Sequence, residues 1–247
     1  SPKVVLAASC GIEVDKVIAY QPLLNDAIDL AEHKPEHVVM LQRDSCEATL
    51  QAPRDIDWRA WENAALPVDC VPVQATDPLY VLYTSGTTGK PKGIVRDNGG
   101  HAVALNYSMS AVYGVQAGDV YWAASDVGWV VGHSYIVYGP LFAGCTTILY
   151  EGKPVRTPDA GAFWRVLAEH KVKSFFVAPT AFRAMRKEDP DCTLLAKHDI
   201  SSLQYQFVAG ERLDPPGNSL LRALRARVKV PHERRLRVCL GRPLQPI

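Results

Sequence analysis

The sequence predicts an α/β protein in which helices cover both faces of a mainly parallel sheet. Short apolar segments of strand length alternate along the chain with segments whose apolar residues recur at helical spacing. Strands that alternate with helices in this way pair in parallel, because each helix returns the chain to the end of the sheet where the strand began. The composition agrees, since 47% of the 247 residues are apolar and 21% are charged. A chain of this length forms one large domain or two lobes.

The first elements form a strand–helix–strand unit. Residues 3–8 and 37–41 are predicted strands, and residues 22–33 are a predicted helix with one apolar face. This order implies parallel pairing of the two strands with a right-handed crossover. Residues 43–78 hold four prolines, so we expect a long surface connection in which two tryptophans cover an apolar seam.

The most distinctive stretch is a polar loop between two short predicted strands. Residues 79–83 are predicted to form a buried strand, and residues 93–96 a second strand. Residues 84–93 carry four hydroxyl groups, three glycines and two lysines. Glycines let backbone N–H groups turn toward a ligand, while hydroxyl and ammonium groups add donors and positive charge. This combination indicates a loop that binds a polyphosphate rather than a simple surface turn.

The loop is not a Walker A site. That motif places four residues between its glycines and starts a helix at its lysine. Here only two residues separate Gly86 from Gly89, and Pro91 follows Lys90. Pro91 has no N–H group and restricts Lys90 to extended geometry. The sequence therefore predicts strand, loop and strand.

The helix after this loop is predicted over residues 98–113. His101 falls in its first turn and is expected on the helix surface. Residues 119–124 are the next predicted strand.

Residues 127–150 contain no Asp, Glu, Lys or Arg, and this length is enough to span a bilayer. We reject a membrane span, because its glycines, a proline, a serine and His133 would leave polar groups in lipid. We predict instead a loop, a buried helix over residues 134–142, a turn at Gly144 and a strand over residues 146–150. His133 is predicted to be a structural, hydrogen-bonding histidine rather than an acid or base.

The last clear elements continue the alternation. A helix is predicted over residues 163–170, a strand over residues 174–178, a helix that opens at Pro179, and a strand over residues 204–209. Ligands of such sheets bind at the carboxyl ends of the strands. The polar loop, the segment around His133 and the residues after the last strand all follow strands, so we expect them to converge.

Charge and cysteine content limit the classes of partner. The net charge is +1, which predicts no bulk attraction to nucleic acid or to an anionic membrane. From Gly217 onward, however, eight Arg or Lys residues face Glu233 alone. Binding of this basic segment to an acidic surface or to nucleic acid is a lesser alternative. The six cysteines have no metal-ligand spacing, which favours free thiols in a reducing compartment. The chain opens at Ser1 without an apolar targeting run, as expected of a processed or partial chain.

The string of residues 83–93 resembles the phosphate-binding signature of the adenylate-forming superfamily, which includes acyl-CoA synthetases, luciferases and peptide-synthetase adenylation domains. Further segments resemble short-chain acyl-CoA synthetases, and among these the mitochondrial propionate–CoA ligases. They are residues 126–135, 138–141, 150–154, 178–181 and 208–212. The resemblance runs from about residue 3 to about residue 214.

The resemblance implies a two-step reaction with ATP, Mg²⁺ and coenzyme A. A carboxylate, propionate, attacks the α-phosphate to give acyl-AMP and pyrophosphate, and the CoA thiol then displaces AMP. The residues that would hold the β- and γ-phosphates are Thr84, Ser85, Gly86, Thr87, Thr88, Gly89 and Lys90. Thr87 and Lys90 are the expected catalytic residues. Gly210, Glu211 and Arg212 match the adenine side, although Glu211 is also compatible with a solvated loop carboxylate.

Trp129, Val130 and Val131 match the acyl pocket of these enzymes. An apolar, β-branched Val131 suits a short alkyl chain, and simple core packing is the alternative for both valines. One methylene contributes only about 1–3 kcal/mol to discrimination. Acetate–CoA ligase therefore remains an alternative.

The resemblance also implies a division of the chain. Residues 1–214 would be a partial AMP-binding domain, the incomplete N-terminal domain of an adenylate-forming enzyme. Residues 215–247 would be a basic tail, disordered or loosely packed. The family's aromatic adenine segment, ribose-binding Asp and C-terminal domain are not found. We therefore expect a catalytically incomplete chain, or alternatively a non-catalytic nucleotide-binding or interaction fragment. The family points to the mitochondrial matrix, to small-molecule partners, and to neither nucleic acid nor membrane.

Overall fold

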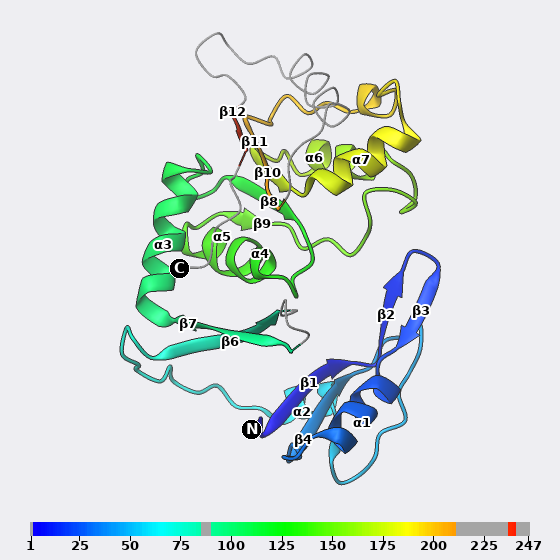
Figure 1. Ribbon diagram of the computed structural model, residues 1–247, viewed down its shortest axis with the longest axis vertical. Helices are drawn as coiled ribbons and strands as arrows, with labels where there is room; N and C mark the ends of the chain where they lie inside the picture. Colours follow the sequence, from blue (N-terminus) through cyan, green and yellow to red (C-terminus); the bar gives the residue numbers. More distant parts are fainter. Residues whose placement is uncertain (1, 85–89, 211–236, 241–247) are drawn as a thin grey trace. The chain divides into compact units, whose positions relative to one another are not determined.

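The computed structural model describes residues 2–84, 90–210 and 237–240, and the chain divides into two compact units (Figure 1). The N-terminal unit ends at Val71, and the C-terminal unit begins at Pro72. This division agrees with the second of the two arrangements that the chain length allowed. The predicted α/β class is confirmed in both units, because each contains a parallel sheet with helices packed on it.

A three-stranded parallel sheet forms the centre of the N-terminal unit. Strand β1 (Val4–Ala8) pairs with β4 (His37–Leu41), which pairs in turn with β5 (Asp55–Asp57). Helix α1 (Gln21–Leu30) connects the first two strands and packs on the sheet around Met40. The predicted strand–helix–strand unit with parallel pairing is therefore confirmed.

Helix α1 ends three residues earlier than predicted, because Ala31 has extended backbone with ψ 138°. The Lys34 ammonium then donates to the carbonyl oxygens of Ile28, at 2.5 Å, and Asp29, at 2.8 Å. A cation at this position satisfies carbonyl groups that the last helical turn leaves free.

An antiparallel hairpin that the sequence did not predict lies between β1 and α1. Strands β2 (Cys10–Glu13) and β3 (Lys16–Ala19) are joined by a two-residue turn. Such turns are usually signalled by Asn-Gly or Asp-Gly, since they need positive φ. Here Val14 adopts φ 57°, which the sequence does not announce.

Part of the predicted surface connection over residues 43–78 is ordered structure. Strand β5 runs directly into helix α2 (Trp58–Ala64). Asp57 is the N-cap of this helix, because its carboxylate accepts the Ala60 N–H at 3.0 Å. The prediction of a plain connection was wrong for this segment and holds for the stretch after α2.

A five-stranded, wholly parallel sheet forms the centre of the C-terminal unit. The strand order is β12-β11-β10-β8-β9. These strands are β8 (Val120–Ala124), β9 (Thr146–Thr147), β10 (Ser174–Val177), β11 (Tyr205–Val208) and β12 (Arg237–Leu240). The prediction of a mainly parallel sheet is confirmed. Strand β9 is shorter than predicted because it pairs only with the first two residues of β8.

Each face of this sheet has its own apolar core. Helices α6 (Ala162–Glu169) and α7 (Pro179–Glu188) pack on the face that carries Trp122. Helix α3 (Asn98–Ala111) contributes to the core on the opposite face, around Tyr121. Figure 1 shows these helices on either side of β8, β10 and β11. Successive buried residues of β8 lie in opposite cores, because the side chains of a strand alternate between its two faces.

One continuous helical segment combines two kinds of helix, α and π. Helix α4 (Val130–Gly132) leads into the π-helix η1 (His133–Tyr138) and then into α5 (Gly139–Phe142). The predicted buried helix is confirmed, and it begins four residues earlier than predicted. No helix in the described part of the chain is both long and apolar enough to cross a membrane.

A separate antiparallel ribbon precedes α3. Strand β6 (Pro78–Thr84) pairs with β7 (Lys92–Asp97), so the predicted strand, loop and strand are confirmed. The prediction that the first of these strands is buried was wrong. Val81 is 50% exposed and Tyr83 is 71% exposed, because only the opposite face of this ribbon packs against helices.

Candidate functional site

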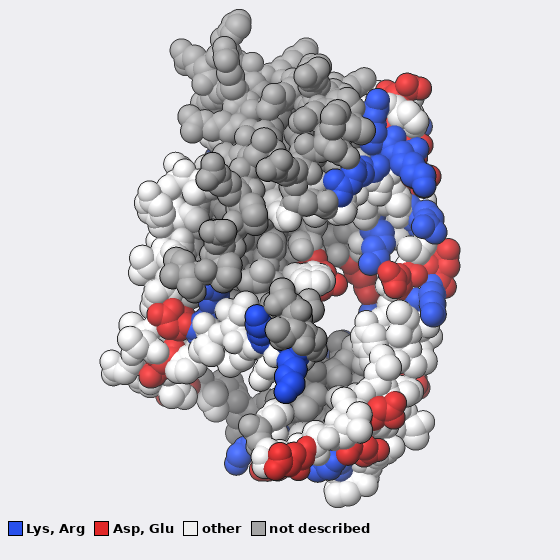
Figure 2. All heavy atoms as spheres, viewed as in Figure 1, with Lys and Arg blue, Asp and Glu red and all other residues white. Residues whose placement is uncertain are grey.

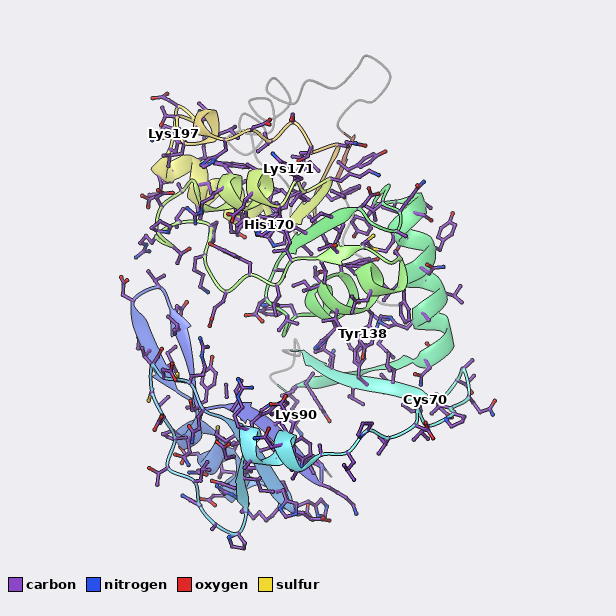
Figure 3. The ribbon with its side chains drawn as sticks, turned by 180° about the vertical axis from the view of Figure 1, so that it is seen from behind. Cys70, Lys90, Tyr138, His170, Lys171 and Lys197 are labelled. Atoms are coloured by element: carbon purple, nitrogen blue, oxygen red, sulfur yellow. The ribbon has the colours of Figure 1, made fainter. Side chains whose placement is uncertain are left out.

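The polar loop connects the two strands of the ribbon. Thr84 is the last residue of β6 and pairs with Lys92, the first residue of β7, so the loop closes a hairpin. Lys90 is exposed and lies two residues before β7, at the same end of the ribbon (Figure 3). Five of the predicted phosphate-binding residues lie outside the described residues, namely Ser85, Gly86, Thr87, Thr88 and Gly89. Their roles and that of Thr84 stay predictions.

The carboxyl ends of the central strands lie side by side. The register pairs Val177 of β10 with Ala124 of β8 and with Val208 of β11. The chain leaves these strand ends toward Trp129 after β8 and toward Gly210 after β11. Two of the segments expected to converge therefore start from the ends of β8 and β11, the two strands that flank β10. The third, the polar loop, belongs to the ribbon and not to this sheet.

A tight turn fixes the segment that carries the predicted acyl-binding residues. The Asp126 carboxylate accepts the Gly128 N–H at 2.7 Å, and the Asp126 carbonyl accepts the Trp129 N–H at 3.2 Å. Gly132 passes so close to this turn that an added Cβ would lie 2.3 Å from the Asp126 carbonyl oxygen. A side chain at position 132 is therefore excluded unless the turn moves.

The three predicted acyl-binding residues differ in exposure. Trp129 is 64% exposed, whereas Val130 and Val131 are partly buried. Val131 packs against the core around Tyr121, which is the packing role that the sequence left open for it. Trp129 and the exposed parts of the two valines are thus the portions of this segment that a ligand can reach.

Gly210 follows β11 with φ 101°, a backbone conformation that glycine adopts without strain. An added Cβ would meet no atom within 4 Å, so conformation rather than space makes glycine suitable there. Glu211 and Arg212 lie outside the described residues, and their predicted adenine-side roles stay predictions.

Four rings gather on the inner face of the ribbon. They are Tyr80 of β6, His101 of α3, and His133 and Tyr138 of η1, and we call them the ring cluster. The prediction that His101 lies on the helix surface was wrong, because its side chain packs under the ribbon and is only 7% exposed. The predicted hydrogen-bonding role of His133 is not seen at Nδ1, which has no hydrogen-bond partner among the described residues.

Burial lowers the pKa of His101 below 6.5, and the positive charge of Arg96 lowers it further. Asp97 acts in the opposite direction, and its carboxylate also accepts the His101 backbone N–H at 3.2 Å. His101 is therefore neutral in the folded chain near neutral pH. The sequence contains two histidines and several tyrosines here, but no local pattern joins residues that lie 21 to 58 positions apart.

The charges of the C-terminal unit are mixed around α7. This helix carries Arg183, Arg186 and Lys187 beside Glu188. Figure 2 shows basic and acidic side chains interspersed over this part of the described surface. Among the residues that the structure describes, no three His, Cys, Asp or Glu side chains gather as a metal site. Binding of MgATP does not require such a cage, because Mg²⁺ is held largely by phosphates and water.

The profile of the AMP-binding enzyme family matches residues 2–233, and the chain belongs to this family. An uncharacterized protein of Pseudomonas aeruginosa is 62% identical over 87% of this chain and 34% of its own length. Human mitochondrial acyl-CoA synthetase short-chain family member 3 is 55% identical over 86% of this chain and 31% of its own length. Propionate–CoA ligase of Escherichia coli is 44% identical over 87% of this chain and 34% of its own length.

The chain therefore spans about a third of the length of the curated relatives it matches. Among solved structures, acetoacetyl-CoA synthetase from Streptomyces lividans matches with a TM-score of 0.81. It is 24% identical and covers 97% of this chain and 35% of its own. This likeness shows that the two share a fold.

Proposed function

We propose that the chain provides the phosphate-binding and acyl-binding segments of a short-chain acyl-CoA synthetase. The reaction converts propionate, ATP and CoA to propionyl-CoA, AMP and pyrophosphate through acyl-AMP. The observation that carries this proposal is the complete string of residues 83–93, which joins β6 to β7 in a chain of the AMP-binding enzyme family. The human relative is a short-chain acyl-CoA synthetase by name and the Escherichia coli relative a propionate–CoA ligase, which supports the substrate class.

The proposed chemistry needs no protein nucleophile, because the substrate carboxylate attacks the α-phosphate itself. The contribution of this chain is to position the reactants and to offset phosphate charge. Lys90, exposed beside the hairpin end, supplies a cation for the β- and γ-phosphates. Backbone N–H groups and hydroxyls of residues 84–89 supply further donors in this proposal. Orientation of bound reactants can lower such a barrier by about 7–11 kcal/mol.

The acyl preference is proposed to come from Trp129, Val130 and Val131. An apolar wall at this position favours a short alkyl group over a polar one. Because one methylene is worth about 1–3 kcal/mol, propionate is preferred over acetate by about 10–200-fold at most. An acetate–CoA ligase is the alternative, and it predicts the opposite order.

Equilibrium binding tests this proposal with the purified 247-residue chain. The ligands are ATP and non-hydrolysable ester analogues of acetyl-, propionyl- and butyryl-AMP, followed by calorimetry. We expect ATP to bind, and the propionyl analogue to bind more tightly than the other two. Absence of binding by all four ligands contradicts the proposed function, and tightest binding of the acetyl analogue supports the alternative.

We further propose that these 247 residues alone turn over slowly or not at all, since they match about a third of each curated relative. An ATP–pyrophosphate exchange assay with propionate measures the first step alone. We expect exchange near background. A rate similar to that of the Escherichia coli relative contradicts catalytic incompleteness and leaves the family assignment intact.

A mitochondrial location is proposed from the name of the human relative. The Pseudomonas aeruginosa relative is more similar, so a bacterial cell is an equally consistent setting for the same chemistry.

A further inference from the structure

The ring cluster connects three elements of the C-terminal unit through contacts with one tyrosine. The centroid of the Tyr80 ring lies 5.6 Å from that of His101, 5.2 Å from that of His133 and 6.0 Å from that of Tyr138. The Tyr80 hydroxyl lies 3.4 Å from Nε2 of His101. Two of these four rings belong to the residue type whose charge changes between about pH 5 and 8.

The π-helix η1 brings two of the rings to the same partner. His133 is its first residue and Tyr138 its last, five positions later. On an α-helix, residues three or four apart share a face, so a separation of five turns the second side chain away. A π-helix bonds residue i to residue i+5 and is wider, which aligns these two positions. This local departure from α-helix geometry therefore builds the cluster around Tyr80.

The surroundings of His101 favour a neutral imidazole over a charged one. The His101 side chain is buried, and Nε of the neighbouring cation Arg96 is buried without a hydrogen-bond partner among the described residues. Protonation of His101 would place a second positive charge near Arg96 in this buried setting. Of the groups that face His101, Arg96 of β7 opposes its protonation and Asp97 favours it, while Tyr80 and Tyr138 face it uncharged.

The attachment of the ribbon depends on this inner face. On the outer face, Val81 and Tyr83 are at least half exposed. Tyr80, by contrast, contacts both α3 and η1. A change in the ring cluster therefore acts directly on β6, the strand that enters the polar loop.

We propose that the ring cluster is a proton-sensitive joint, which holds the ribbon β6–β7 on α3 and η1 while the His101 imidazole is neutral and releases it when His101 is protonated. The attached state is fully favoured above about pH 6.5, the ordinary pKa of histidine, and loses stability as the pH falls below that value. Control of ATP binding by this joint rests on the proposed function, whereas the joint itself does not.

Hydrogen–deuterium exchange of the purified chain tests the joint without any ligand. Protection factors, corrected for the intrinsic pH dependence of exchange, are compared between about pH 7.5 and about pH 5.5. We expect the protection of β6 to be lower at the lower pH, while β8 and β10 keep theirs. Unchanged protection of β6 overturns the proposal.

Glutamine variants separate the joint from ordinary acid sensitivity. The variant His101→Gln keeps this side chain neutral, so the protection of β6 should no longer depend on pH. His170→Gln is the matched control, since His170 is exposed at the end of α6 (Figure 3). If His170→Gln removes the pH dependence and His101→Gln keeps it, the proposal is wrong. NMR titration of the His101 imidazole in the unmodified chain does not depend on the folding of a variant, and an ordinary pKa for His101 overturns the proposal.

Measurement of ATP affinity at the same two pH values tests the functional consequence. We expect affinity to fall with the protection of β6. If the chain binds no ATP at either pH, the proposed function fails and the exchange data still decide the joint. Equal affinity at both pH values, together with pH-dependent exchange, confirms the joint and overturns its control of ATP binding.

Discussion

Lys90 is exposed and has no described ion-pair partner, so its charge is available to a ligand at the end of the ribbon. We predict that Lys90→Ala weakens ATP binding by about 10–100-fold, because a charge-assisted hydrogen bond contributes about 1.5–3 kcal/mol. Isothermal titration calorimetry of both chains measures this difference. Thermal unfolding should be unchanged, since the side chain makes no described contact that the fold needs.

Lys197 provides the control for this measurement. It is an exposed lysine of the same unit, in the short 3₁₀ helix of residues 195–197 (Figure 3). Lys197→Ala removes the same charge without touching the ribbon, so ATP affinity should not change. Equal weakening by both substitutions would indicate a general charge effect and contradict the assigned role of Lys90.

The composition of residues 84–93 was enough to predict phosphate binding by the polar loop. No pattern in the sequence predicted the ring cluster. The loop is contiguous in sequence, so its hydroxyls, glycines and lysines can be recognised together. Tyr80, His101 and His133 are brought together only by the packing of β6, α3 and η1. A single histidine in the first turn of a helix has no local signal for burial, because burial depends on what packs over it.

Among the elements, the turn before α4 gives a sharp test. We predict that Gly132→Ala destabilises the C-terminal unit by about 1–3 kcal/mol, because the new methyl group would overlap the backbone of Asp126 and Val127. It should also change the fluorescence of Trp129, which this turn positions. Urea unfolding and emission spectra measure the two effects.

Gly128→Ala is the matched substitution. An added Cβ there meets only a carboxylate oxygen of Asp126, at 3.1 Å, and that side chain can move. The expected loss of stability is below about 1 kcal/mol, as for most tolerated surface changes. A loss equal to that of Gly132→Ala would mean that the close backbone approach at position 132 does not control the turn.

Strands in the sheet centre were predictable and short flanking elements were not. Strands β8, β10 and β11 are mostly apolar and rich in aromatic residues, as expected of strands buried on both faces. The hairpin β2–β3 has neither a run of this kind nor a glycine turn. Helix α2 has only seven residues, too few for a clear helical period. The sequence therefore predicts the elements that are determined by burial. It misses the short elements that depend on local capping and turn geometry.

At the scale of the whole chain, the stretch between α2 and β6 is the expected site of proteolytic cleavage. Its apolar residues are highly exposed, with Leu66 at 83%, Val68 at 90% and Val71 at 81%. It joins two units that each have their own core. Exposed segments without regular structure are cut first.

We predict that limited proteolysis with thermolysin, which cleaves before large apolar residues, cuts between residues 65 and 74. Mass spectrometry identifies the cut, and the C-terminal fragment should retain the near-ultraviolet dichroism of its aromatic core. Persistence of this stretch after β8 and β10 have been degraded would contradict the division into two units.

The strand order β12-β11-β10-β8-β9 has a consequence for how the protein is made. Strand β8 receives β9 on one side soon after it leaves the ribosome, but β10, its partner on the other side, begins only at Ser174. Contacts between distant parts of a chain form slowly and leave apolar surface open meanwhile. A nascent chain that has not reached β10 therefore carries Trp122 without Phe175, the ring that stacks on it at 5.0 Å. Chaperones are expected to bind this exposed edge of β8 during translation.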